Sequence, residues 1–341
     1  MKTLSGKSAC GLAAILLATA SAAAQEIDIR ISVKYILDAN GVRPSGTYST
    51  DASVQNIFTR VNQTLRRWNR GYRYVLTEFR NVSGYSAFFN IDSTAEYYAL
   101  EDSAEDAVVA FSWRTDAVNL FIVNNSAVGG GAAAIPTVPA DAGYELVVFS
   151  VNVNPADVLW LHELGHHFNL FHTFNDDGVA DTRPDPNPFQ CTMPFQCPLG
   201  GSMECCCSTK QTLLTNAANA GGWSQQERDD IRFNNMSYHC PLTLDNLRMT
   251  DGQLDRWTDA SRRHYSNQVS GLTYFVNWTN LTAPFNGYST DPYAFVSSAV
   301  SAANAAGGDI VLIRGGNYDE SMTITKPVTL RATRGAATIG Q

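Results

Sequence analysis

The sequence predicts an α/β fold in which strands alternate with helices, followed by a smaller β-rich tail. Two strand-like segments, residues 27–36 and 72–82, flank a segment whose apolar residues recur at helical spacing. Two further apolar runs, residues 118–123 and 146–151, follow with helix-like sequence before or after them. Strands separated by helices are typical of an α/β core. The tail begins near residue 292, where short apolar runs follow one another closely.

The first half of the chain has clear local signals. The strand over residues 27–36 leads to a helix that Gly71 is placed to end. The apolar residues that define this helix are Val54, Ile57, Phe58, Val61, Leu65 and Trp68. After the strand over residues 72–82, residues 94–110 are expected to form a helix or a loop and a helix. Glycines 129–131 then interrupt the chain before a short extended segment, residues 132–135.

The second half holds two more helices with identifiable starts. Asn154 and Pro155 supply an N-cap and a first-turn proline for a helix that reaches about Phe168. Thr250 and Gln253 form a capping-box pair that opens a helix over residues 251–264. Between these helices, residues 176–222 are rich in Asp, Pro, Cys and Gly. We expect that segment to be irregular and tied by disulfides.

The tail is expected to be a separate unit. Residues 265–291 are predicted to be a linker, and residues 292–305 a helix. The β-rich runs that follow are residues 310–314, 322–325, 328–332 and 337–339.

Residues 1–24 have the features of a secretory signal peptide. Lys2 and Lys7 precede an apolar run over residues 11–20, and small residues at 21–24 predict cleavage after Ala24. The alternative is a membrane anchor, but the apolar run is shorter than the roughly 20 residues that span a bilayer. We therefore expect a protein that is secreted to the extracellular space or the periplasm.

Composition narrows the classes of partner. The chain has 341 residues, 44% of them hydrophobic and 16% charged, as in ordinary globular proteins. Without Lys2 and Lys7, 22 basic residues stand against 32 acidic residues, a net charge of −10. This balance argues against nucleic acid or an anionic membrane as partner. The sequence does not indicate an oligomeric state.

Six cysteines remain after the signal peptide. An even number in an oxidising compartment favours disulfides, whose connectivity the sequence does not define. The run at 205–207 suggests a second metal site as an alternative, but no histidine lies near it in sequence. The six are Cys191, Cys197, Cys205, Cys206, Cys207 and Cys240.

The most informative stretch is HELGHHFNLFH, residues 162–172. On a helix, His162 and His166 lie one turn apart, so both imidazoles can bind one ion. Glu163 lies beside them and can act as the general base on a water molecule at the metal. A catalytic zinc site needs three protein ligands and one open position, so a third ligand must come from elsewhere.

Three candidates exist for that third ligand. A glutamate from a later helix would suit, but none occurs between Glu163 and Glu204. An aspartate such as Asp176 is an alternative. His172 fits best, provided that the chain turns after the helix. Asn169 lies where this turn is required, and asparagine tolerates a left-handed backbone.

These motifs resemble the metzincin clan of zinc proteases, and within it the pappalysin-like family. The likeness is carried by HELGHHFNLFHTF (162–174), NDDGVADT (175–182), NNMSY (234–238) and MTDGQLDRW (249–257), and it covers about residues 118–262. The family has glycine where this chain has Asn169. The resemblance implies a twisted mixed sheet with an active-site helix, and a substrate paired with an edge strand near residues 131–135.

The resemblance also implies roles for single residues. Met236 would form the hydrophobic floor beneath the zinc, and Tyr238 would lie near the metal and stabilise the oxyanion of the tetrahedral intermediate. Family members bind calcium near the aspartate loop. Oxygen ligands of the kind that calcium prefers are available there, on Asp176, Asp177, Asp181 and Thr182.

The tail, residues 292–341, resembles the opening coils of a right-handed parallel β-helix of the pectate-lyase type. Gly307-Gly308-Asp309, Gly316-Asn317-Tyr318 and Lys326-Pro327-Val328 carry this likeness. One or two coils are fewer than a solenoid usually needs, so we expect the tail to dock on the preceding domain or to belong to a chain shorter than its relatives.

Two functions follow from the sequence. The first is a secreted zinc endopeptidase that cleaves a protein or peptide substrate, with Glu163 as base. The alternative is an inactive secreted binding protein whose β-helix-like tail recognises a glycan or a cell surface. The intact set of His162, Glu163, His166 and His172 favours the enzyme.

Overall fold

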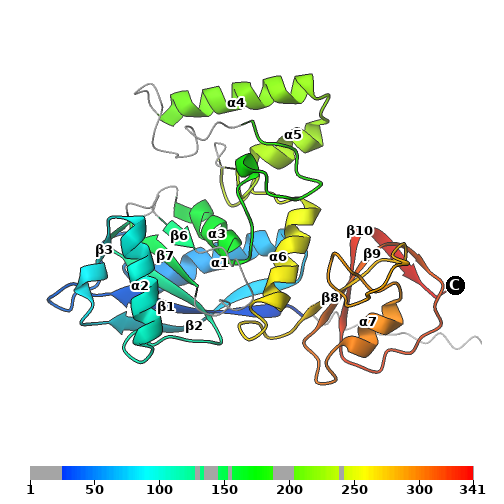
Figure 1. The fold of residues 1–341 in the computed structure, drawn as a ribbon, viewed down its shortest axis with the longest axis horizontal. Helices are drawn as coiled ribbons and strands as arrows, with labels where there is room; N and C mark the ends of the chain where they lie inside the picture. The colour runs from blue at the N-terminus through cyan, green and yellow to red at the C-terminus, as the bar shows by residue number, and fades with distance from the viewer. Residues whose placement is uncertain are drawn as a thin grey trace, which may run out of the picture.

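The computed structural model describes residues 25–126, 131–133, 145–152, 156–186, 203–237 and 242–340. Within these ranges the protein is a mixed α/β structure with seven α-helices, a five-stranded sheet and a smaller three-stranded sheet. Figure 1 shows the larger sheet with α1, α2 and α3 around it, and the smaller sheet at the C-terminal end. The predicted signal peptide, residues 1–24, lies outside the described residues.

The five-stranded sheet is mixed, as expected. Its order is β2-β1-β4-β7-β6, with parallel pairs except for the antiparallel pair of β6 and β7. The strands are β1 (Ile27–Ile36), β2 (Tyr72–Val82), β4 (Val118–Val123), β6 (Gly131–Ala133) and β7 (Leu146–Ser150). The four long strands match their predicted positions. Among the strands that the structure describes, β6 forms one edge of this sheet, and an edge strand can pair with a further strand.

Two apolar cores cover the two faces of this sheet. On one face, alternate residues of β1 pack against α1 (Asp51–Trp68) and α3 (Ala156–His167). On the other face, α2 (Thr94–Asp106) buries Tyr97 and Leu100 against β4 and β7. Figure 1 shows α2 in front of the sheet and α1 behind it. The core therefore holds α3 firmly against the sheet.

The C-terminal end of α1 differs from the prediction. The helix ends at Trp68, and Asn69 adopts the left-handed conformation that closes it, with φ of 56°. Gly71 also has a positive φ, 81°, but it lies in the turn that leads to β2. Gly71 therefore shapes the connection and does not end the helix, because asparagine tolerates the left-handed cap.

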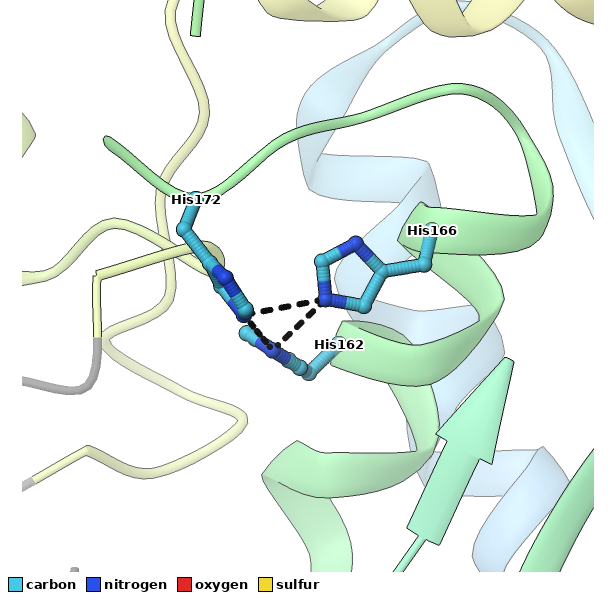
Figure 2. A group of neighbouring side chains, drawn as sticks. All are labelled: His162, His166 and His172. Atoms are coloured by element: carbon cyan, nitrogen blue, oxygen red, sulfur yellow. Dashed lines mark hydrogen bonds between the residues drawn. The ribbon is translucent and has the colours of Figure 1, made fainter. Parts of the chain in front are cut away.

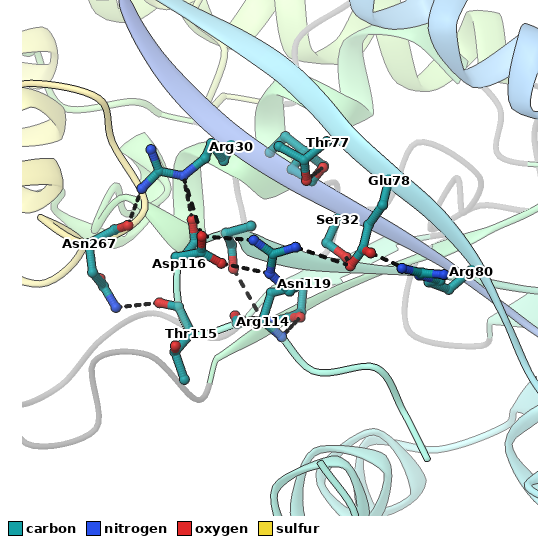
Figure 3. Close-up of polar contacts among 12 residues, drawn as sticks. Arg30, Ser32, Thr77, Glu78, Arg80, Arg114, Thr115, Asp116, Asn119 and Asn267 are labelled. Atoms are coloured by element: carbon teal, nitrogen blue, oxygen red, sulfur yellow. Dashed lines mark hydrogen bonds and ion pairs between the residues drawn. The ribbon is translucent and has the colours of Figure 1, made fainter. Parts of the chain in front are cut away.

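A polar network runs across β1, β2 and the segment that leads into β4 (Figure 3). Arg114 forms a bidentate pair with Asp116 at 2.7 and 2.8 Å, and Arg30 donates to the Asp116 carbonyl at 2.7 Å. Glu78 accepts from Ser32 at 2.7 Å and from Arg80 at 2.8 Å. These pairs are partly exposed, so each contributes modestly to stability.

The expectation of an irregular segment over residues 176–222 is wrong from Met203 onward. Residues Met203–Ala220 form α4, followed by α5 (Gln225–Arg232), which starts with a capping box at Ser224 and Glu227. All the prolines of the segment precede residue 199, so nothing in the sequence of α4 interrupts a helix. The helix α4 includes Cys205, Cys206 and Cys207. Cys191, Cys197 and Cys240 lie outside the described residues.

The C-terminal part forms a parallel sheet in the order β10-β9-β8. Part of residues 265–291, expected to be linker, instead forms β8 (Thr273–Val276), and α7 is shorter than predicted, at Val296–Ala302. β9 spans Ile310–Tyr318, and one strand, β10 (Thr329–Ile339), covers two of the predicted runs. The run at residues 322–325 is not a strand.

This small sheet packs on the larger domain. Ile310 and Leu312 of β9 belong to the same apolar core as α1 and α3, while Val311 and Ile313 face α7. Tyr72 at the start of β2 contacts Thr273 through their hydroxyls, at 2.7 Å. The tail is therefore docked on the domain, one of the two arrangements that its length allowed. Across the described residues, no helix is both long and apolar enough to cross a membrane.

Candidate metal centre

Three imidazoles from α3 and the segment after it converge on one point (Figure 2). The Nε2 atoms of His162, His166 and His172 lie 3.0, 3.1 and 3.2 Å from one another. His162 and His166 lie one turn apart on the same face of α3. In the described part of the chain, this is the one group of three His, Cys, Asp or Glu side chains close enough to hold a metal ion.

The turn that presents His172 is built by Asn169. Its φ is 65°, in the left-handed region, as the sequence predicts. The Asn169 N–H donates to the His166 carbonyl at 2.9 Å, and the Leu170 N–H donates to the Gly165 carbonyl at 3.0 Å. This pair of bonds is the hydrogen-bond pattern that ends many helices and reverses the chain direction. The chain thus returns His172 to the face of α3 that carries the other two imidazoles.

Backbone carbonyls orient two of the three rings. His162 Nδ1 lies 2.6 Å from the Asn235 carbonyl, and His166 Nδ1 lies 2.7 Å from the Leu170 carbonyl. A carbonyl can only accept, so each Nδ1 carries the hydrogen, and in a neutral ring each Nε2 then carries a lone pair. These two partners had no signal in the sequence, because any residue can supply a backbone carbonyl.

Burial keeps the three rings neutral. It lowers the pKa of His166 to about 4 and that of His172 to about 3, and it holds the pKa of His162 well below its usual value. Lone pairs on His162 and His166 therefore face each other at 3.2 Å, which is unfavourable unless a cation lies between them. The arrangement is that of a metal site.

The geometry suits a tetrahedral ion. For Zn–N bonds of about 2.0–2.1 Å, tetrahedral nitrogens lie about 3.3–3.4 Å apart. The observed separations of 3.0–3.2 Å are close to this value. Three protein ligands on one side leave the fourth position for water or substrate, as in catalytic sites.

Glu163 lies between the histidines in sequence and against β6 in space. Burial raises the pKa of Glu163 to about 8, and a hydrogen bond from the backbone of Ala133 on β6 opposes this rise. A Cβ atom added to Gly131 would lie 3.0 Å from Glu163 Cγ, so the edge strand passes directly over this side chain. The edge strand and the carboxylate are therefore neighbours.

Met236 lies beneath α3, in the turn that contains Asn235. It is fully buried, and its sulfur would lie 3.0 Å from a Cβ added to Gly165. The Met236 carbonyl accepts the N–H of Thr173 at 3.2 Å, which ties this turn to the residue after His172. Tyr238, the expected oxyanion donor, lies outside the described residues.

The calcium site at the aspartate loop stays a prediction, because calcium also takes backbone carbonyls and water as ligands. Asp176, Asp177 and Asp181 do not bring their carboxylates together as a metal-binding group. Their oxygens accept backbone N–H groups, from Gly178, Val179 and Gly252 respectively. Thr182 contacts the hydroxyl of Thr250 at 3.2 Å. The third member of the histidine cluster is His172, and Asp176, which is exposed, is not part of it.

Comparisons with known proteins add little to this geometry. No protein-family model matches the chain, and no curated protein matches it. A structure of mirolysin in complex with a compound is 14% identical, has a TM-score of 0.41, and covers 72% of this chain and 96% of its own. A structure of a chaperone–substrate complex is 12% identical, has a TM-score of 0.30, and covers 43% of this chain, which spans only 24% of the other. Likenesses this weak assign neither fold nor activity, so both rest on the geometry described above.

Proposed function

We propose that this protein is a secreted zinc-dependent endopeptidase. The observation that carries the proposal is the convergence of three neutral imidazoles within 3.0–3.2 Å, beside a buried carboxylate. A ligand set of three imidazoles without a carboxylate favours zinc over magnesium or calcium, which prefer oxygen ligands. His162, His166 and His172 would hold the ion. Secretion rests on the signal-peptide features of residues 1–24.

When bound, zinc would polarise the scissile carbonyl and make water acidic enough to react near neutral pH. Glu163 would take the proton of the attacking water and pass it to the leaving amine. A neighbouring cation favours the ionised form of a carboxylate, so the pKa of Glu163 would fall from about 8 into the range of a useful base. We assign Tyr238 the role of hydrogen-bond donor to the oxyanion.

The substrate would bind as an extended peptide along β6. This strand is an edge of the sheet, it lies over Glu163, and its outer side can pair with another strand. Main-chain hydrogen bonds of that kind suit a protein or peptide substrate of varied sequence. Calcium at residues 176–182 remains a prediction that the carboxylate arrangement does not support.

The C-terminal sheet is consistent with the proposed likeness to β-helix coils. β9 pairs in parallel with both β8 and β10, and the connection from β9 to β10 contains no helix. Parallel strands linked by loops are typical of such coils; the step from β9 to β10 has this pattern, whereas α7 lies between β8 and β9. We propose residues 25–264 as the catalytic domain, and a tail of this type that includes β8 as well as residues 292–341.

The test replaces Glu163 and follows zinc content and peptide cleavage separately. Glu163→Ala and Glu163→Gln should keep one zinc per chain and lose cleavage by about 10²–10⁴-fold, because only the proton transfer is removed. Glu105→Gln, the same change on the exposed face of α2, is the control and should cleave like the wild type. Chelation should abolish activity, and added Zn²⁺ should restore it.

Two outcomes would reject the proposal. Equal cleavage by wild type and Glu163→Ala would reject the assigned base. A purified wild type that binds zinc but cleaves no peptide library would favour the binding-protein alternative, in which the tail recognises a glycan or a cell surface.

A further inference from the structure

Gln253 lies on α6 (Asp251–Arg263), and its side-chain amide joins two segments next to the proposed metal site. The residue is 1% exposed. Its Nε2 donates to Asp177 Oδ2 at 2.8 Å and to Asn234 Oδ1 at 3.3 Å. Its Oε1 accepts from Asn234 Nδ2 at 2.8 Å and from the Thr250 N–H at 3.1 Å. Donor and acceptor ends are both used, so the amide has one orientation.

Asn234 carries this constraint to the ring of His162. Asn234 Oδ1 accepts the N–H of Met236 at 2.9 Å, which closes the turn beneath α3. The residue within that turn, Asn235, presents its carbonyl to His162 Nδ1 at 2.6 Å and donates from its side chain to the Leu161 carbonyl at 2.9 Å. Gln253 is therefore one side chain away from the turn that orients the first imidazole.

Asp177 carries the constraint to the segment that follows His172. Asp177 Oδ1 accepts the N–H of Val179 at 2.9 Å, and its backbone carbonyl accepts from Arg256 on α6. Asp177 lies five positions after His172, and the backbone N–H of Thr173, between them, donates to the Met236 carbonyl. The loop that presents the third imidazole is thus attached to the same amide as the turn that orients the first.

We propose that Gln253 is a positioning residue for the metal centre. Its amide holds the Asp177 loop and the Asn234–Asn235 turn together, so that His162 and His172 are in place before the ion binds. This inference rests on the proposed function. The Asp177 carboxylate accepts a hydrogen bond from the Gln253 amide. Glutamate at position 253 would replace this donor with a second carboxylate, and the two negative charges would repel each other. Residues that orient metal ligands in this way typically change metal affinity when they are altered.

The test measures Zn²⁺ affinity by competition with a chromophoric chelator, without reference to cleavage. Gln253→Glu should weaken zinc binding by about 10–100-fold, the usual effect of losing a residue that orients a ligand. The double variant Gln253→Glu/Asp177→Asn places an amide donor opposite the new carboxylate and should recover most of the lost affinity. Loss of packing alone would not produce this recovery.

A matched control and a second variant complete the design. Gln226→Glu on α5 makes the same change at an exposed glutamine that donates to Asp230 at 2.7 Å, and it should bind zinc like the wild type. Asp177 accepts one hydrogen bond with each carboxylate oxygen, from Val179 and from Gln253. In Asp177→Asn an NH₂ group replaces one oxygen and faces one of these donors, and no buried charge is added. This variant should weaken zinc binding too, and it tests the same contact should Gln253→Glu fail to fold.

The outcomes separate this inference from the function on which it rests. Wild-type affinity in both Gln253→Glu and Asp177→Asn, or no recovery in the double variant, would overturn the inference while the wild type still binds zinc and cleaves peptide. A wild type that binds no zinc would overturn the proposed function, and the inference with it.

Discussion

Asn169 is the residue on which the position of the third imidazole most directly depends. Its left-handed backbone, with φ of 65°, reverses the chain between His166 and His172. A side chain branched at Cβ meets its own carbonyl in that conformation, whereas asparagine tolerates it and glycine adopts it freely. The site therefore depends on the backbone preference of a residue that is not itself a proposed metal ligand.

Substitution at Asn169 should separate these preferences. Asn169→Gly should leave zinc affinity close to that of the wild type, because glycine accepts the same backbone angles. Asn169→Val should lower the free energy of unfolding by about 1–2 kcal/mol and weaken zinc binding. Urea unfolding of the metal-free protein and chelator competition measure the two effects. Asn56→Val, on the exposed face of α1, is the control. A valine variant as stable as the wild type would show that the turn does not need this backbone.

At the scale of elements, the contact between β6 and α3 places the edge strand over the proposed base. Gly131 on β6 lies against both Glu163 and the ring of Phe149, at 3.0 and 3.1 Å from a Cβ built on it. The absence of a side chain at Gly131 allows this approach. Ala133 then donates its N–H to the Glu163 carboxylate. A small strand of three residues thus shapes the surroundings of the proposed base.

Gly131→Ala should reduce kcat by about tenfold or more with no change in zinc content. The added methyl group would force Glu163 to shift by a few tenths of an ångström, and small displacements of a reacting group are costly. Steady-state kinetics on a peptide substrate, with zinc measured on the same sample, check this. Ala52→Ser, at an exposed position of α1, serves as the control. Unchanged kcat in Gly131→Ala would mean that Glu163 is free to adjust.

At the scale of the molecule, the C-terminal sheet and the α/β domain share one apolar core. Ile310 of β9 is fully buried in the cluster that also contains α1 and α3. Arg334 on β10 adds an ion pair to Asp255 on α6, at 2.7 Å. Elements that share a core unfold together, so we expect one cooperative transition for both parts.

Ile310→Ala should lower the stability of the whole molecule by about 2–5 kcal/mol, because it leaves a cavity where the two parts meet. Thermal unfolding followed by circular dichroism should show a single transition at a lower temperature. Ile324→Ala makes the same change at an isoleucine that is 47% exposed, and should have little effect. Two separate transitions, only one of them shifted, would mean that the tail folds independently.

Several elements and most of the candidate site could be predicted because their causes are local. The spacing of His162 and His166 puts both rings on one face of any helix, and the backbone preference of Asn169 allowed the turn to His172. The capping box of Thr250 and Gln253 marked the start of α6 correctly. By contrast, the sequence did not predict α4. The prolines that make residues 176–222 look irregular all lie in the first half of that segment, before α4 begins.

The sequence by itself determined α1, α3 and α6, the four long strands of the larger sheet and the identity of the three converging imidazoles, because periodicity, caps and turns act over a few residues. Only the tertiary structure decided that β6 lies over Glu163, that β8 joins the tail to a shared core, and that the carbonyls of Asn235 and Leu170 orient the rings. Gln253 makes the difference plain: its sequence neighbours define a helix cap, but its long-range partners are 19 and 76 positions away. Such pairings depend on how distant segments pack, and no local pattern encodes them.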